Sequence, residues 1–253
     1  MSTESLVIES TPDGVDILRL HHGKANALDL ELCGALTSVL AEARPREGPL
    51  VLTGMGSIFS AGVDLFRVVD GGRPYVEQFL PALEHLFLQL FTLPRPVIAA
   101  INGHAIAGGC LMACACDYRV MADGTGRIGV PELAVGVPFP PSAIELLRAV
   151  NNPAHVEELV YMGRTYDARA AASIGLVNEV VPPEQAVARA VDVARDLGAR
   201  PARSFRLTKQ FVRGPAAERI RAALPGRQEL IDAWASDDTF AAIREYLRRT
   251  LKK

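Results

Sequence analysis

Two glycine-rich segments hold the residues of this chain best suited to chemistry, and they offer backbone groups rather than side chains. The first covers residues 53–65, reads TGMGSIFSAGVDL and follows a short apolar run. Because glycine has no β-carbon, a ligand can approach the backbone N–H groups of such a segment closely. A plain turn between a strand and a helix is the alternative interpretation.

The second segment, residues 97–114, reads VIAAINGHAIAGGCLMAC. Its pattern predicts a strand that leads into Gly108 and Gly109, followed by an apolar helix. The first N–H groups of a helix have no partner within it and lie at the positive end of its dipole, so they can stabilise a developing negative charge. The alternative is a buried helix whose glycines permit close packing.

The elements that must position these segments alternate between strand and helix. Apolar strand-like runs at 15–20, 50–53, 97–101 and 176–181 are separated by helical patterns, which favours a parallel α/β arrangement. Asp29 can cap a helix with a stripe of leucines and valine, and a second apolar stripe covers 76–90, with Pro81 expected to kink that helix or to restart it.

The last quarter of the chain differs from the rest. Asp167 is expected to cap a short helix that stops at Gly175, before the strand at 176–181. Beyond about residue 185 only helical patterns rich in Ala, Leu and Arg remain, broken by prolines. We therefore expect a helical appendage that packs on the core or on a neighbouring subunit.

Composition narrows the function classes. The chain has 253 residues, 49% of them hydrophobic, and a formal net charge of −2, which favours one domain and gives no basic footprint for nucleic acid. The four cysteines form no C-x-x-C pair and the five histidines no metal spacing, so we expect buried cysteines in a reducing compartment and no metal site.

The sequence shows no secretory signal and no apolar stretch of about 18 residues, which predicts a cytoplasmic protein without membrane contact. No G-x-S-x-G surrounds a serine, which argues against a serine hydrolase.

Taken together, the motifs closely resemble the crotonase superfamily, the enoyl-CoA hydratases and isomerases. The matching stretches are FSAGVDL (59–65), INGHAIAGGC (101–110), CDYR (116–119), PEL (131–133) and GLVNEVVP (175–182). The resemblance implies an α/β fold built as a spiral of ββα units over residues 1–195. It also implies a C-terminal helical trimerisation region over 196–253, and hence a homotrimer or hexamer.

The same resemblance implies the substrate and its contacts. An acyl-CoA would place its thioester oxygen in an oxyanion hole formed by the N–H groups of Val63 and Gly108. The CoA portion would run along Lys24 and Ala25 and along Ala61 to Val63, and no cofactor is implied beyond the coenzyme A of the substrate. Lys24 could reach a phosphate, although a solvated surface lysine is the alternative.

One departure from the family pattern bears on the reaction. Hydratases of this family carry a glutamate at the position of Leu111 and a second one at the position of Glu132, and here only Glu132 is present. Hydration usually divides its proton transfers between two carboxyls, whereas a single carboxylate can move a proton from carbon 2 of a 3-enoyl thioester to carbon 4. The resemblance therefore favours a 3,2-enoyl-CoA isomerase of fatty acid β-oxidation, with Glu132 as the base and a raised pKa.

Other residues receive lesser roles. Leu111 and Phe139 are expected in the acyl pocket, and Glu145 is a reserve acid. Asp64 is expected to cap the next helix, and Asp117 to bind backbone groups or Arg119 in the core. Enoyl-CoA hydratase, or another crotonase reaction such as thioester hydrolysis, is the first alternative function, and a non-catalytic acyl-CoA-binding protein is the second.

Overall fold

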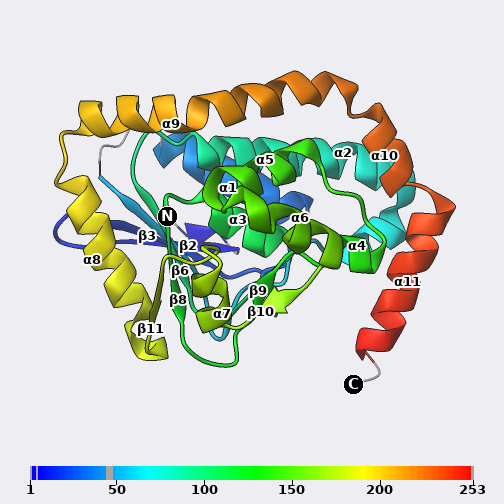
Figure 1. The fold of residues 1–253 in the computed structure, drawn as a ribbon, viewed down its shortest axis with the longest axis horizontal. Coiled ribbons are helices and arrows are strands. Elements are labelled where there is room, and N and C mark those ends of the chain that lie inside the picture. Colours follow the sequence, from blue (N-terminus) through cyan, green and yellow to red (C-terminus); the bar gives the residue numbers. More distant parts are fainter. Residues whose placement is uncertain (1, 4, 44–47, 252–253) are drawn as a thin grey trace.

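A mixed sheet forms the centre of the molecule (Figure 1). The computed structural model describes residues 2–3, 5–43 and 48–251. Seven strands lie in the order β1-β2-β3-β4-β6-β8-β11, and they are parallel from β3 onward. Their bounds are β1 (Ser2–Thr3), β2 (Leu6–Ser10), β3 (Asp16–Leu20), β4 (Leu50–Gly54), β6 (Val97–Ile101), β8 (Tyr118–Ala122) and β11 (Glu179–Val181). The expected parallel α/β arrangement is confirmed.

A second, smaller sheet brings the two glycine-rich segments together. Its order is β10-β9-β7-β5, with β5 (Ile58–Ser60), β7 (His104–Ile106), β9 (Ile128–Gly129) and β10 (Thr165–Tyr166). Strands β5 and β7 are parallel, with Ile58 opposite His104 and Ser60 opposite Ala105. Since parallel neighbours end at the same edge, the residues that follow both strands emerge side by side.

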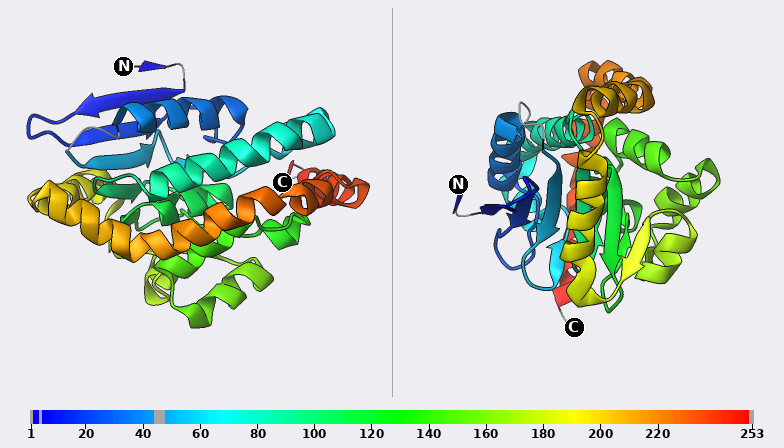
Figure 2. Two further views of the ribbon diagram at one scale, coloured as in Figure 1. Left: turned by 90° about the horizontal axis from the view of Figure 1, so that it is seen from above. Right: turned by 90° about the vertical axis from the view of Figure 1, so that its left-hand side faces the viewer.

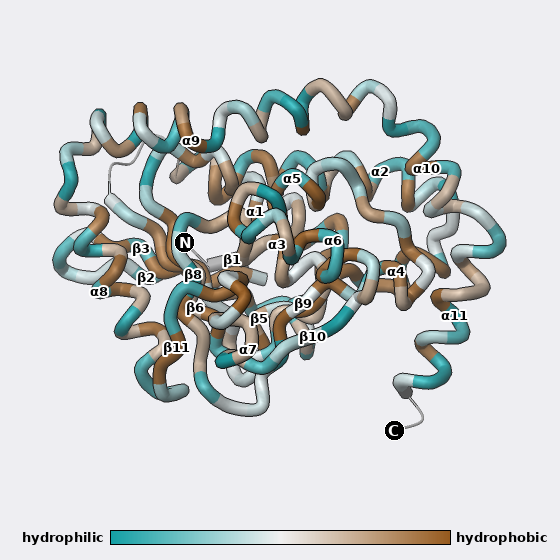
Figure 3. The backbone as a smooth tube through the Cα atoms, in the orientation of Figure 1, coloured by the Kyte–Doolittle hydropathy of each residue, from teal (hydrophilic) through white to brown (hydrophobic). Residues whose placement is uncertain are grey.

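The helices surround the large sheet on both faces. They are α1 (Leu30–Ala43), α2 (Leu65–Phe91), α3 (Gly108–Ala115), α4 (Glu132–Val135), α5 (Pro141–Val150), α6 (Pro153–Met162), α7 (Ala168–Ser173), α8 (Ala186–Gly198), α9 (Ala202–Ala223), α10 (Gln228–Trp234) and α11 (Asp237–Leu251), with 3-10 turns at Pro183–Gln185 and Leu224–Gly226. Side chains of β6 alternate between two apolar clusters: Ala99 packs with α1 to α3, and Ala100 packs with α8. Helix α8 faces the viewer in the right-hand view of Figure 2, and the central strands are strongly apolar in Figure 3.

Several expected helix boundaries are confirmed by hydrogen bonds. The Asp29 carboxylate accepts from the N–H of Leu32, at 2.8 Å, before α1. The Asp64 carboxylate accepts from two N–H groups at the start of α2, and Asp167 accepts from Ala170 N at 2.8 Å before α7. Gly175, with φ of 79°, follows the end of α7.

The helix expected around residues 76–90 is confirmed. It begins at Leu65 and is interrupted at Gly72, with φ of 57°, while Pro81 lies inside it, so of the two alternatives expected at Pro81 the restart is wrong. The expected start of the strand at 176–181 is also wrong, because the strand begins at Glu179. The N–H groups of Leu176 and Val177 bond to the carbonyl of Ala171 instead, so these two residues close the preceding helix.

The C-terminal helices form a long arm over the other elements. Helix α9 crosses the top of the molecule in Figure 1, beside α2 and α5, and α11 descends on the right beside α4. After Val181 the described residues contain no strand, as expected. The predicted boundary between 195 and 196 falls inside α8, and residues 252–253 of the predicted C-terminal region lie outside the described residues. No described helix is both apolar enough and long enough to cross a membrane.

Candidate active site

The two glycine-rich segments touch each other just beyond β5 and β7. Gly62 has φ of 89°, and a β-carbon there would lie 2.6 Å from the carbonyl oxygen of Ile106 and 3.2 Å from the backbone nitrogen of Gly108. A β-carbon on Gly108 would lie 2.8 Å from the side chain of Leu28. Gly62 therefore needs glycine both for space, because it meets backbone atoms, and for its backbone conformation, whereas a side chain at Gly108 would require the end of the Leu28 side chain to move.

The backbone N–H of Val63 points away from Leu28, the residue that pairs with it on the neighbouring segment. Leu28 forms a parallel bridge with Val63: its N–H donates to Gly62 O at 2.7 Å, and its carbonyl accepts from Asp64 N at 2.9 Å. In a parallel pairing, a residue whose two neighbours bond to the partner points its own N–H to the opposite side. The opposite side is the one on which β7 leads into Gly108.

Helix α3 begins at the point of contact. Gly108 is its first residue, and the preceding Ala107 contributes no side-chain cap hydrogen bond. Ala107 has φ of 52° and is held by the bond from its N–H to Gly129 O, at 2.8 Å. A positive φ at alanine is strained, and such strain is found preferentially at functional sites. The helix therefore presents N–H groups and positive dipole charge next to Val63.

A cavity of about 80 Å³ opens at this junction. The residues that line it come from four parts of the chain: both glycine-rich segments, α4 with its flanking loop, and the C-terminal helices. They are Ala61, Val63, Leu65, Ile106, Ala107, Pro131, Glu132, Val135, Val137, Trp234 and Tyr246. Apart from Glu132 and the polar groups of Trp234 and Tyr246, these side chains are apolar.

Glu132 contributes the one carboxyl group among the described residues that line this cavity. It is the first residue of α4 and is only 9% exposed. Burial raises the pKa of its carboxyl to about 8, against the opposing effect of a hydrogen bond to its own backbone. Its Oε2 atom is buried without a hydrogen-bond partner. A carboxyl with a pKa near neutrality and a free oxygen can both accept and donate a proton.

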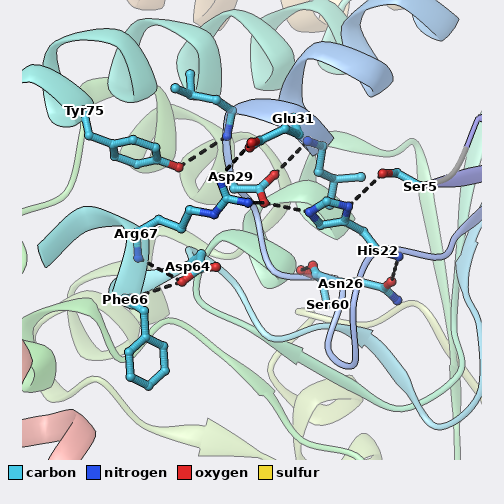
Figure 4. Close-up of polar contacts among 12 residues, drawn as sticks. Ser5, His22, Asn26, Asp29, Glu31, Ser60, Asp64, Phe66, Arg67 and Tyr75 are labelled. Carbon is cyan, nitrogen blue, oxygen red and sulfur yellow. Dashed lines mark hydrogen bonds and ion pairs between the residues drawn. The ribbon is translucent and has the colours of Figure 1, made fainter. Parts of the chain in front are cut away.

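The turn at residues 22–26 fixes the strand that leads to Val63 (Figure 4). Buried Asn26 has φ of 47°, and its Nδ2 donates to Ile58 O at 3.2 Å and to Phe59 O at 3.1 Å. The Ser60 hydroxyl donates back to Asn26 O at 2.7 Å. The turn and the strand are thus bonded in both directions.

A second set of contacts in Figure 4 anchors the turn to the start of α1. His22 Nε2 lies 2.7 Å from Asp29 Oδ2, and His22 Nδ1 lies 2.8 Å from Ser5 Oγ. Asp29 also caps α1 and lies 3.6 Å from Arg67. Because Asp29 is already engaged in this way, we interpret the Ser–His–Asp row as structural support for the turn.

The residues expected to contact CoA lie on this turn and beside the cavity. Lys24 is exposed, Ala25 is half-buried and accepts a hydrogen bond from Ala61 N at 2.9 Å, and Ala61 is exposed at the cavity. Leu111 is buried in α3, and Phe139 is half-buried against the core; neither is among the residues that line the cavity. Their assignment to the acyl pocket stays a prediction.

Trp234 and Tyr246 line the cavity although sequence reasoning did not find them. They follow Glu132 by about a hundred residues, and no motif links them to it. Trp234 is the single tryptophan of the chain, which is the one signal that could have drawn attention to it.

Two other carboxylates that were considered from the sequence pair with cationic side chains outside the cavity. Glu145 does not line the cavity, since Arg148 at 3.1 Å and Arg219 at 2.7 Å occupy its two oxygens; it is wrong as a reserve acid. Asp117 accepts from the backbone N–H of Val97, as expected, but its cationic partners are Lys209 and Arg213 rather than Arg119. Within the described chain, no group of three or more His, Cys, Asp or Glu could hold a metal ion.

Comparisons with known proteins agree on one family. A family model described as enoyl-CoA hydratase/isomerase matches residues 10–249. A putative enoyl-CoA hydratase of Thermus thermophilus is 37% identical over 194 residues, covering 75% of this chain and 76% of that protein. The mouse mitochondrial enoyl-CoA delta isomerase 1 is 32% identical over 221 residues, covering 85% and 76%. The crystal structure of human mitochondrial delta3-delta2-enoyl-CoA isomerase superposes with a TM-score of 0.94 at 26% identity, covering 98% of both chains.

Proposed function

The chain belongs to the enoyl-CoA hydratase/isomerase family, and we propose that it moves the double bond of a 3-enoyl-CoA from position 3 to position 2. The crotonase-like fold and the enzymatic character of the protein follow from its relatives. The observation that carries the choice of reaction is the cavity beside Val63, where Glu132 is the one carboxylate among the described lining residues.

In the proposed reaction Glu132 transfers a single proton. Its ionised carboxylate removes a proton from carbon 2 of the bound 3-enoyl thioester. The electrons of that C–H bond form a double bond between carbons 1 and 2, and the carbonyl π electrons move onto the thioester oxygen, which gives a dienolate that still has its double bond between carbons 3 and 4. The N–H groups of Val63 and Gly108 stabilise that oxygen, and one such donor is typically worth about 10² to 10³ in rate. Glu132 then returns the proton to carbon 4.

The position of Leu111 supports isomerisation over hydration. Leu111 is 3% exposed and sits on α3 among apolar neighbours. A hydratase needs a second group to handle water, and the family places a glutamate at this position. Leucine there leaves the water without an acid or base on that side.

Hydration remains the second candidate because relatives carry that name, including the Thermus protein and a crotonyl-CoA hydratase of Syntrophomonas wolfei. A spectrophotometric comparison of 3-hexenoyl-CoA with crotonyl-CoA separates the two. We expect conversion of 3-hexenoyl-CoA, little hydration of crotonyl-CoA, and a rate about 10² to 10⁴ lower for Glu132→Gln. Fast hydration of crotonyl-CoA contradicts the proposal, and binding of acyl-CoA without turnover of either compound would point to a non-catalytic binding protein.

We further propose that the CoA portion lies along Lys24, Ala25 and Ala61, and that no cofactor is needed beyond it. The exposed side chain of Lys24 and the exposed Ala61 beside the cavity support this path. A Lys24→Ala variant should raise the KM for 3-hexenoyl-CoA while leaving kcat unchanged, because a phosphate contact acts on binding alone.

The oligomeric state is proposed as a homotrimer, or as a hexamer made of two trimers, formed through the C-terminal helices. Helix α9 exposes Leu207, Phe211 and Val212, the last two by 74% and 73%. A cavity of about 590 Å³ beside Phe211 contains neither glycine-rich segment nor Glu132, so we assign it to subunit packing rather than to catalysis. Light scattering of the wild type and of Phe211→Asp tests this, and a monomeric wild type contradicts it. The four free cysteines are all buried, in keeping with a cytoplasmic, reducing location.

A further inference from the structure

The C-terminal helices of the chain complete the wall of its own catalytic cavity. Trp234 is the last residue of α10, and Tyr246 lies on α11; both line the cavity that contains Glu132. In Figure 1 these two helices descend beside α4, the helix that begins with Glu132. An element remote in sequence thus limits the space available to the substrate.

Trp234 is held rigidly in this position. Its side chain is 2% exposed, and its Nε1 donates to the carbonyl of Pro138 at 2.9 Å. A β-carbon on Gly136 would lie 2.6 Å from the β-carbon of Ala242 on α11, so the loop after α4 and the C-terminal helices are in close contact. The indole therefore cannot leave the cavity by a simple rotation, because its hydrogen bond and the packing of α11 both oppose that movement.

The residues that line the cavity differ in exposure. Ala61 is exposed and Val63 half-buried on the glycine-rich segment, where the reacting thioester would lie in the proposed reaction. Val137 and Trp234 are the most buried of the lining residues, each 2% exposed. An acyl chain that enters beside Ala61 and places its carbonyl at Val63 has this buried part of the lining left to occupy.

The volume of the cavity sets a scale for that chain. An apolar cavity of about 150 Å³ holds benzene, with six carbons. The cavity here is about 80 Å³, roughly half that size, so it accommodates only a few carbons. We propose that Trp234 closes the acyl end of the cavity and restricts the protein to short acyl chains. This inference rests on the proposed handling of acyl-CoA.

Chain-length selectivity of turnover tests the proposal. The kcat/KM values for 3-butenoyl-, 3-hexenoyl- and 3-decenoyl-CoA are measured for the wild type, Trp234→Ala and Trp234→Leu. We expect the wild type to convert the two short compounds and to discriminate against 3-decenoyl-CoA. Each methylene newly buried is worth about fourfold, so Trp234→Ala should raise the ratio of the decenoyl to the butenoyl value by at least about tenfold. Trp234→Leu, which keeps an apolar side chain in place, should shift the ratio less, and it decides the question if the alanine variant does not fold.

Phe240 provides the matched comparison. It is an aromatic residue on α11 that is half-buried against the core, and it does not line the cavity. Phe240→Ala should leave the ratio within about twofold of the wild type. A shift caused by Phe240→Ala and not by the Trp234 variants overturns the assignment, as does a wild type that converts 3-decenoyl-CoA as well as 3-butenoyl-CoA.

Binding separates this inference from the reaction itself. Calorimetric titration with saturated butanoyl-CoA and decanoyl-CoA requires no turnover, so it reports chain-length preference even if the protein is not an isomerase. We expect the wild type to bind butanoyl-CoA at least as tightly as decanoyl-CoA, and Trp234→Leu or Trp234→Ala to reverse that order. An unchanged order in folded variants, verified by circular dichroism, overturns the role of Trp234 whatever the reaction proves to be.

Discussion

Gly62 and Gly108 approach so closely that a β-carbon on Gly62 would lie 3.2 Å from the backbone nitrogen of Gly108. The same β-carbon would lie 2.6 Å from Ile106 O, so an added methyl group must push the two segments apart. The two proposed donors of the oxyanion hole belong to these segments. Their spacing therefore depends on the absence of one methyl group.

Gly62→Ala should reduce kcat for 3-hexenoyl-CoA by about 10² to 10³, the typical effect of losing one such donor. The control is Gly175→Ala, because Gly175 also has a positive φ, of 79°, but nothing lies within 4 Å of its added β-carbon. Both variants carry backbone strain, and only the first disturbs the hole. Equal losses of kcat in the two variants would show that strain alone, rather than the hole, was responsible.

The activity should depend on pH through Glu132, whose pKa burial raises to about 8. As a base it must be ionised, so kcat/KM should rise with pH and level off above an apparent pKa of about 8. Glu84→Gln is the matched control, since Glu84 is also buried, has a pKa raised by burial and does not line the cavity. A profile that is flat between pH 6 and 9 in the wild type would contradict Glu132 as the base.

The same carboxyl should make the stability fall as pH rises. The folded state binds this proton more tightly than the unfolded state, since the pKa is raised from 4.5 to about 8. Its contribution is therefore complete below pH 4.5 and is lost as the pH rises through about 8. Glu132→Gln should gain thermal stability relative to the wild type on going from pH 5 to pH 9. The difference in Tm between the two proteins at each pH measures this, and a constant difference would refute it.

Asn26 should affect both stability and rate. Asn26→Asp keeps the acceptor oxygen and tolerates φ of 47°, but it removes the donor to the carbonyls of Ile58 and Phe59. We expect a loss of about 1–3 kcal/mol in the free energy of unfolding, together with a lower kcat, because the strand leading to Val63 loses its support. Asn102→Asp makes the same chemical change at a bond to Gly56 O that is exposed, and it should cost less and leave kcat unchanged.

A buried cluster should control the docking of α9. The Asp117 carboxylate lies 2.7 Å from Lys209 Nζ and 3.1 Å from the Arg213 guanidinium, which also donates to the carbonyls of Ala115 and Cys116 at the end of α3. Asp117→Asn should cost about 3–5 kcal/mol in the free energy of unfolding, because it leaves two buried cations without their counter-charge. The exposed pair of Asp123 and Arg169 is the control, and Asp123→Asn should cost less than about 1 kcal/mol. Chemical denaturation of both variants measures these two losses in the free energy of unfolding.

Much of the local structure was predictable because it depends on neighbours in the sequence. The caps at Asp29, Asp64 and Asp167 bond to N–H groups two or three residues away, and the fully buried strands at Leu50–Gly54 and Val97–Ile101 are continuous apolar or small-residue runs. The start of the last strand was placed wrongly at Leu176 because the N–H groups of Leu176 and Val177 bond to the carbonyl of Ala171 and close the preceding helix, which an apolar run does not reveal.

By itself the sequence determined the alternation of strands and helices and the two glycine-rich segments. It also determined that a glutamate is present at position 132 while position 111 holds a leucine. Only the tertiary structure decided that these segments touch, that Glu132 is buried with a raised pKa, and that Trp234 and Tyr246 line the same cavity. The reason is physical. A cap or an apolar stripe is formed within one stretch of chain, whereas burial and the depth of a cavity arise from elements about a hundred residues apart, whose contacts no local pattern specifies.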